Sequence, residues 1–224
     1  MTRFDAVVFD LDNTLCRNTH DTAALYERAF ERAGIEPFGR PEELWAALDG
    51  PPDPDDTVSY FGAGFARLAA QHGRSEVDPL TLAAALAETI DHSQVEFLPG
   101  AERMLDRART LGRVGVLTNG PRSRQEPKVE ALALADRVDE VVYAGDLPRR
   151  KPHIEPFETM LSALDVDADR TLYVGDSLAY DVAGAQNAGL AVAWLREDDV
   201  GAGEYRPEYV IESLAGLDDI LGHD

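Results

Sequence analysis

From residue 101 onward, short apolar runs alternate with stretches that show helical spacing. The apolar runs lie at 114–120, 140–146, 171–176 and 191–195, and the intervening helical stretches include 101–111, 124–135 and 154–164. Short strands that alternate with helices are typical of right-handed βαβ units and a parallel sheet. A further apolar run, AVVFD at 6–10, predicts a strand buried on both faces. The sequence therefore predicts an α/β core to which this first strand belongs.

A long helical block separates the first strand from the others. Within residues 17–94, apolar positions recur at helical spacing over 22–34, 41–50, 57–72 and 79–94. Because the strands on either side belong to one sheet, the simplest interpretation is an insertion. We expect a core formed by residues 1–16 and 95–224, with an all-helical domain at 17–94.

The charge of the chain limits its partners. Asp and Glu number 42 against 21 Lys and Arg, which gives a net charge of −21. Such a chain repels duplex nucleic acid and anionic membranes, so we expect neither as a partner. Only Lys128 and Lys151 are lysines, and this acidic, lysine-poor composition resembles that of proteins from salt-loving organisms.

Three further features of the composition favour a cytoplasmic location. Cys16 is the only cysteine, which excludes an internal disulfide and a cysteine-based zinc cluster. The N-terminal residues do not resemble a signal peptide, and no apolar run approaches the roughly 20 residues that span a bilayer.

Polar side chains follow several of the predicted strands at the point where each ends. They comprise Asp10 and Asp12, Thr118 and Asn119, Lys151 in the loop after 140–146, and Asp176, Ser177 and Asp181. Ligands of open parallel sheets bind outside the carboxyl ends of the strands. Each residue taken alone has an ordinary explanation, such as a helix cap or a solvated charge. Together they predict a site that contains several carboxylates and one ammonium group.

The expected cluster of carboxylates favours phosphoryl chemistry. Two like charges about 4 Å apart repel by roughly 4 kcal/mol at an effective dielectric near 20, so converging carboxylates need a cation or protons. Mg²⁺ prefers oxygen ligands and commonly bridges to substrate phosphates. The Lys151 ammonium and the Thr118 hydroxyl would suit phosphoryl oxygens.

The chain resembles the haloacid dehalogenase (HAD) superfamily in four motifs. They are DLDNTL at 10–15, LTNG at 117–120, the lysine of RRKPHIEPF at 149–157, and VGDSLAYDVAGAQNAG at 174–189. The resemblance spans about residues 6–195. It implies a Rossmann-like core with a helical cap inserted after the first motif, and it implies Mg²⁺ as cofactor.

The resemblance also implies a role for each matching position. Asp10 would be the nucleophile that forms an aspartyl-phosphate, and Asp12 would act as the general acid and base. Mg²⁺ would be held by Asp10, the backbone carbonyl of Asp12 and Asp176, with Asp181 supporting the metal directly or through water. Thr118 and the backbone at Asn119 would bind phosphoryl oxygens. Lys151 would neutralise the nucleophile and the transferred group.

Within the superfamily, the residues favour hydrolysis of the phosphate ester of a small metabolite. Dehalogenases of the family lack an acid at the position of Asp12, and phosphonate hydrolases need a cap lysine, whereas no lysine precedes Lys128. The stretch TNGPRSRQEPKVE at 118–130 resembles sialic-acid-phosphate and nucleotide phosphatases. A phosphosugar mutase and a non-catalytic binding protein remain alternatives. The particular ester and the oligomeric state do not follow from the sequence.

Overall fold

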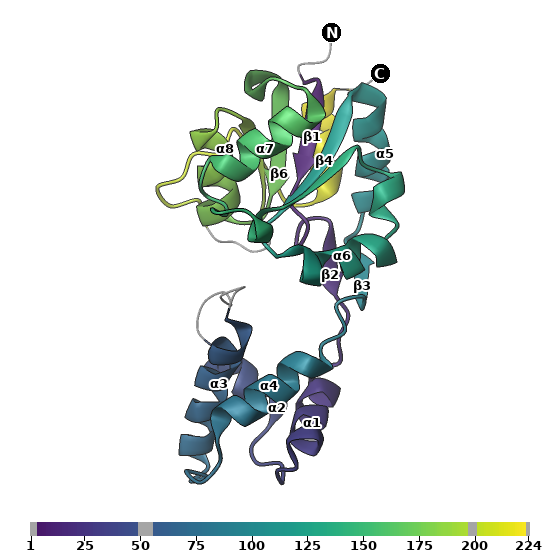
Figure 1. Ribbon diagram of the computed structural model, residues 1–224. Coiled ribbons are helices and arrows are strands. Elements are labelled where there is room, and N and C mark those ends of the chain that lie inside the picture. Colours follow the sequence, from purple (N-terminus) through teal and green to yellow (C-terminus); the bar gives the residue numbers. More distant parts are fainter. Residues whose placement is uncertain (1–3, 49–55, 197–200, 223–224) are drawn as a thin grey trace. The chain divides into compact units, whose positions relative to one another are not determined.

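The chain forms two compact units. The computed structural model describes residues 4–48, 56–196 and 201–222 (Figure 1). One unit consists of Met1–Asn18 and His92–Asp224, and the other of Thr19–Asp91. No helix in the described part of the chain is long and apolar enough to cross a membrane.

The first unit contains a six-stranded sheet with the order β5-β4-β1-β6-β7-β8. Every neighbouring pair of these strands is parallel, which confirms the predicted α/β core. The strands are β1 (Ala6–Phe9), β4 (Arg113–Thr118), β5 (Glu140–Tyr143), β6 (Thr171–Gly175), β7 (Ala191–Leu195) and β8 (Tyr209–Ile211). Because β1 lies between β4 and β6, the first strand of the chain occupies the middle of the sheet.

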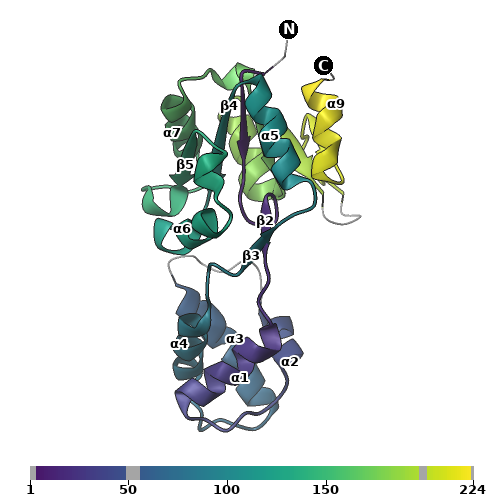
Figure 2. The same cartoon turned by 90° about the vertical axis from the view of Figure 1, so that its right-hand side faces the viewer.

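Both faces of the sheet are covered, and strand β1 contributes to both sides. Val7 and Phe9 pack into one apolar cluster with α5 (Ala101–Leu111) and α9 (Leu217–Leu221), whereas Ala6 and Val8 face α7 (Glu155–Leu164) and α8 (Ala183–Asn187). This alternation follows from the two-residue period of a strand. Figure 2 shows α5 and α9 on the near side of the sheet. Each large apolar side chain buried in this way stabilises the fold by about 1.5–3 kcal/mol.

The second unit is helical throughout its described elements. It contains α1 (Thr22–Ala33), α2 (Pro41–Ala47), α3 (Thr57–Gln71) and α4 (Pro79–Thr89). Aspartates cap three of these helices, since the side chains of Asp21, Asp56 and Asp78 accept hydrogen bonds from backbone N–H groups of the first turn. Its core surrounds Phe30 and Phe65, whose rings meet edge to face with centroids 6.0 Å apart.

The structure corrects the prediction that residues 17–94 are entirely helical. β2 (Cys16–Asn18) pairs antiparallel with β3 (Val95–Phe97), and α4 ends at Thr89 rather than at residue 94. Three-residue strands are too short for their period to show in sequence. The pair is accompanied by a cross-strand ion pair of 2.7 Å between Arg17 and Glu96. The assignment of 17–94 to an inserted domain stays a prediction.

Shorter elements connect the strands of the first unit. The helix predicted over 124–135 is α6 (Arg122–Ala131), followed by a 3₁₀ turn. The 3₁₀ turns are η1 (Leu134–Asp136), η2 (Ala144–Asp146), η3 (Ala168–Arg170) and η5 (Leu214–Gly216), and a single π-helical turn, η4 (Leu178–Val182), precedes α8. Such π turns are frequent at functional sites.

Candidate active site

Three carboxylates from two strand ends meet at one point in the first unit. Asp10 directly follows β1, and Asp176 directly follows β6, its neighbour in the sheet. The Asp10 N–H donates to the carbonyl of Val174 on β6 at 2.8 Å, which fixes Asp10 beside that strand. One carboxylate oxygen each of Asp10, Asp176 and Asp181 lies within 4.8 Å of the others. The parallel topology thus brings together residues that are about 170 positions apart in the chain.

The loop after β6 holds Asp181 firmly. The Ser177 N–H donates to Asp181 Oδ2 at 3.0 Å, and the Asp181 residue is only 1% exposed. A Cβ added at Gly175 would lie 2.4 Å from Asp181 Cγ, so the end of β6 requires glycine for this close approach. Asp176 is supported separately, because Thr14 donates to its Oδ1 at 3.3 Å.

The ammonium group of Lys151 is buried against this cluster. Its Nζ lies 2.6 Å from Asp10 Oδ1 and 2.7 Å from Asp181 Oδ1, and it also approaches the Tyr173 hydroxyl at 2.9 Å. The Lys151 side chain is 2% exposed. A buried lysine of this kind needs paired charges, and the two aspartates supply them.

The side chain of Asn119 positions the backbone of Lys151. Asn119 Oδ1 accepts a hydrogen bond from the Lys151 N–H at 2.9 Å, and Asn119 Nδ2 donates to the Lys151 carbonyl at 3.2 Å. This pair of bonds ties the end of β4 to the lysine loop. The resemblance to the family implies a role only for the backbone at Asn119, as a phosphoryl contact, and does not reveal this use of its side-chain amide.

Burial and neighbouring charge perturb the titration of these groups. Burial raises the pKa of the Asp10 carboxyl well above its usual value, Lys151 opposes this, and the charges of Asp181 and Asp176 raise it further. Burial acts to lower the pKa of the Lys151 ammonium, but Asp10 and Asp181 outweigh it and the pKa is raised. Burial, followed by the charges of Asp181 and Asp10, raises the pKa of the Tyr173 hydroxyl well above its usual value.

The donor set of the cluster fits a hard divalent cation. Three carboxylates share a small volume, and one ammonium cannot balance all three charges. Carboxylate oxygens are the ligands that Mg²⁺ prefers. A cation would offset the two causes that raise the pKa of Asp10, which are burial first and then repulsion by Asp181 and Asp176.

The carboxylate of Asp12 is oriented by helix α6 through two contacts. Gln125 Nε2 donates to Asp12 Oδ2 at 2.6 Å and to Thr118 Oγ1 at 2.6 Å, and Lys128 Nζ lies 2.6 Å from Asp12 Oδ1. Gln125 and Lys128 are both buried, and neither is among the site residues predicted from the sequence. Two features of the sequence pointed to these residues. Lys128 is one of only two lysines, and Gln125 and Lys128 both lie in the stretch TNGPRSRQEPKVE at 118–130.

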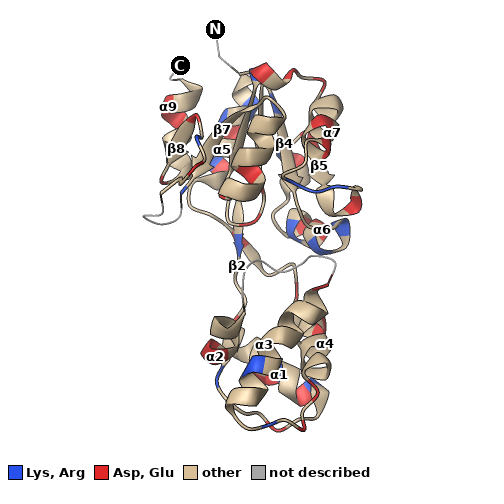
Figure 3. Ribbon diagram, turned by 90° about the vertical axis from the view of Figure 1, so that its left-hand side faces the viewer, with Lys and Arg blue, Asp and Glu red and all other residues tan. Residues whose placement is uncertain are grey.

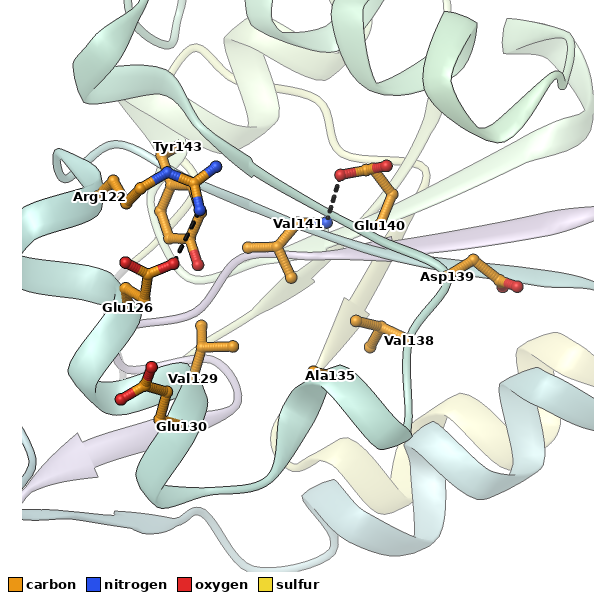
Figure 4. Close-up of a pocket in the computed structure, with 10 residues that line it drawn as sticks. All are labelled: Arg122, Glu126, Val129, Glu130, Ala135, Val138, Asp139, Glu140, Val141 and Tyr143. Carbon is orange, nitrogen blue, oxygen red and sulfur yellow. Dashed lines mark hydrogen bonds and ion pairs between the residues drawn. The ribbon is translucent and has the colours of Figure 1, made fainter.

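A separate hollow lies between α6 and β5, and its ten lining residues include none of the predicted site residues (Figure 4). There the Arg122 guanidinium covers the ring of Tyr143, 4.4 Å from its centroid, and lies 2.8 Å from Glu126. Arg122 is therefore engaged by Tyr143 of β5 and by Glu126 of its own helix.

Comparison with known proteins agrees with this architecture. A family model for haloacid dehalogenase-like hydrolases matches residues 4–189. Pyrimidine 5'-nucleotidase YjjG of Escherichia coli K12 is 30% identical, with 98% of each chain covered. The phosphoglycolate phosphatase of Rhodospirillum rubrum is 34% identical over 97% of this chain and 90% of its own.

A solved structure extends the comparison to three dimensions. YfnB from Bacillus subtilis, a HAD-hydrolase crystallised with magnesium, superposes with a TM-score of 0.73 at 26% identity, covering 99% of this chain and all of its own. The fold, the four motifs and these matches establish the class. The chain belongs to the haloacid dehalogenase-like hydrolases, and its full-length relatives place it among the phosphatases of that family.

Proposed function

We propose that this protein is a Mg²⁺-dependent phosphomonoester hydrolase that acts on a small phosphorylated metabolite through an aspartyl-phosphate on Asp10. The observation that carries the proposal is the cluster of buried Asp10 and Asp181 with half-buried Asp176, beside which the Lys151 ammonium lies 2.6 Å from Asp10. A carboxylate held beside a fixed cation is a nucleophile placed where an anionic phosphoryl group can approach.

In the first step, an Asp10 oxygen attacks phosphorus and the bond from phosphorus to the ester oxygen breaks. The departing alkoxide takes a proton from Asp12. Thr118 donates its hydroxyl hydrogen to a phosphoryl oxygen, and the backbone at Asn119 binds another. Lys151 faces the growing negative charge, which favours the transition state over the bound ester.

In the second step, Asp12 takes a proton from a water molecule as that water attacks phosphorus. The bond between phosphorus and the Asp10 oxygen breaks, which restores the Asp10 carboxylate and releases inorganic phosphate. Asp12 then carries the proton needed for the next turnover, so a single residue serves both steps.

The metal would be held by Asp10, the backbone carbonyl of Asp12 and Asp176, with Asp181 beside them. Bound Mg²⁺ supplies positive charge that offsets the negative oxygens of the phosphoryl group. The magnesium in YfnB supports this assignment. The side chain of Asp12 stays free of the metal in this proposal because α6 engages both of its oxygens.

The substrate class is taken from the relatives. YjjG acts on pyrimidine 5'-nucleotides and the Rhodospirillum rubrum enzyme on phosphoglycolate, as their names state, so small phosphate monoesters are the first candidates. A phosphosugar mutase would use the same paired acids, Asp10 and Asp12. Conversion of a hexose 1-phosphate without net release of phosphate would favour the mutase.

The test is a screen of phosphorylated metabolites for released phosphate, run in high-salt buffer with Mg²⁺ and repeated with EDTA. The proposal predicts turnover of at least one monoester in Mg²⁺ and its loss in EDTA. Turnover that persists in EDTA would contradict the role of the metal, and the absence of turnover across a broad panel would contradict hydrolysis.

A further inference from the structure

We propose that Gln125 and Lys128 are positioning residues that hold the general acid and base Asp12 in its working orientation, and that Gln125 also directs the Thr118 hydroxyl toward the phosphoryl group. This inference rests on the proposed function and goes beyond it. It starts from two buried polar residues, on one helix, for which the catalytic steps above provide no role.

Gln125 and Lys128 lie on the same face of α6, because residues three apart are neighbours on a helix. Each engages a different oxygen of the Asp12 carboxylate, at 2.6 Å in both cases. Two contacts to two oxygens fix both the position and the plane of the carboxylate. A group that must meet a leaving oxygen, and later a water, gains rate from being fixed in this way.

The amide of Gln125 also determines which hydrogen bond the Thr118 hydroxyl accepts and which it is left to donate. In the ionised state that Asp12 takes when it acts as base, its carboxylate only accepts hydrogen bonds, so the NH₂ end of Gln125 faces Asp12. Its second hydrogen then goes to Thr118 Oγ1 at 2.6 Å. With an oxygen lone pair occupied in this way, Thr118 keeps its one hydroxyl hydrogen for an external acceptor such as a phosphoryl oxygen.

The turn after β4 has a glycine, Gly120, where the Gln125 side chain packs against it. A Cβ added at Gly120 would lie 2.6 Å from Gln125 Cγ and 2.8 Å from its Nε2. The Gln125 residue is 3% exposed and the Lys128 side chain is 8% exposed. Burying an amide and an ammonium costs free energy unless both are paired, and the partner they share is Asp12.

The proposal predicts a dependence on the leaving group. An alkoxide needs a proton as it departs, whereas 2,4-dinitrophenolate leaves without one. Loss of the correct Asp12 orientation therefore slows the first step for an alkyl ester and leaves it nearly unchanged for the dinitrophenyl ester. The second step still needs Asp12 as base for either substrate, so phosphoenzyme accumulates when dinitrophenolate has left.

The experiment compares propyl phosphate with 2,4-dinitrophenyl phosphate in Mg²⁺, using wild type, Gln125→Ala, Lys128→Met and the control Glu130→Gln. Glu130 is an exposed acid on the same helix, outside the proposed machinery. We expect kcat/KM for propyl phosphate to fall about 100-fold in both test variants, within the range that general acid–base catalysis contributes. For the dinitrophenyl ester, kcat/KM should change less than about 3-fold, because its leaving group needs no proton from Asp12.

A second readout separates positioning from a loss of structure. In Gln125→Ala and Lys128→Met, the dinitrophenyl ester should give a burst of dinitrophenolate equal to the enzyme concentration, followed by a slower steady state, with kcat and KM reduced together. Equal losses of kcat/KM for both esters, or no burst, would overturn the inference while leaving the hydrolase intact. If wild type cleaves neither ester, the proposed function itself fails.

Discussion

Replacing Lys151 with methionine should destabilise the protein strongly at neutral pH. The substitution keeps the length and apolar stem of the side chain but removes the ammonium that pairs with Asp10 and Asp181. Both aspartates are at most 9% exposed at their side chains, so water cannot replace the lost charge. The variant therefore leaves carboxylates buried without their counter-ion.

The size of the effect follows from these distances. At an effective dielectric near 20, charges separated by 2.6 Å and 2.7 Å attract by about 6 kcal/mol in each pair. Desolvation of the ammonium and relaxation of the variant offset much of this, and breaking a buried pair from one side typically costs about 3–5 kcal/mol. We expect a loss of that size in the free energy of unfolding.

The loss should also depend on pH. Without Lys151, burial and the neighbouring acids raise the pKa of Asp10 with nothing to oppose them. A carboxyl whose pKa is higher in the folded state gives its full stability below the unfolded value, about 3.9, and loses it as pH rises. The deficit relative to wild type should therefore grow from pH 4 to pH 8.

Urea denaturation in EDTA at several pH values measures this deficit directly. Lys128→Met is the matched control, because its partner Asp12 has a side chain that is 37% exposed and should tolerate the loss with a cost of about 1–3 kcal/mol. A Lys151→Met variant within about 1 kcal/mol of wild type, or a deficit that stays constant with pH, would refute the electrostatic account.

Three further outcomes are expected. Gly175→Ala should cost about 1–3 kcal/mol in urea denaturation and reduce phosphatase activity, since its Cβ would displace Asp181; unchanged activity would contradict this. A hydrogen bond from the Val114 N–H lowers the pKa of Asp139, so Asp139→Asn should cost about 1 kcal/mol at pH 7. This cost should shrink as pH falls below about 4 toward the lowered folded pKa, and a cost that does not change with pH would disprove the reasoning. Helices of both units carry acidic residues (Figure 3), and salt screens the repulsion among them. Tm should therefore rise as KCl is increased from about 0.1 M to about 1 M, and a falling Tm would count against salt adaptation.

The sheet was predictable because its signal is local and repeated. Each strand is a short apolar run, and a polar residue marks its carboxyl end. Asp10 and Asp176 directly follow β1 and β6, and Thr118 is the last residue of β4. The parallel order then brings these ends to one edge without any knowledge of side-chain packing. The expectation of a cytoplasmic protein stays a prediction.

The contacts around Asp12 were not predictable in the same way. The sequence marks Gln125 and Lys128 only through the scarcity of lysine and the stretch at 118–130, and neither signal indicates a contact with Asp12. Their role depends on how α6 packs beside the turn at Gly120. The role of Tyr173 was equally hard to predict, because this residue lies inside an apolar strand, where the sequence indicates an ordinary core residue. Its hydroxyl reaches Asp181 at 3.0 Å only because β6 and the η4 turn are adjacent.

The ribbon formed by β2 and β3 was missed for a different reason. Its strands have three residues each and are separated by the whole helical unit. Such a pairing depends on where the unit begins and ends, and hydrophobic periodicity carries no information about it.

The most direct test of the account is phosphate release from p-nitrophenyl phosphate by Asp10→Asn in saturating Mg²⁺. Asp165→Asn is the matched control, because Asp165 is exposed and its left-handed conformation, with φ of 56°, suits asparagine equally well. We predict that Asp10→Asn loses at least about 1,000-fold of the wild-type rate and forms no acid-stable phosphoenzyme, whereas the control retains full activity. Wild-type turnover by Asp10→Asn would contradict the assignment of Asp10 as the nucleophile.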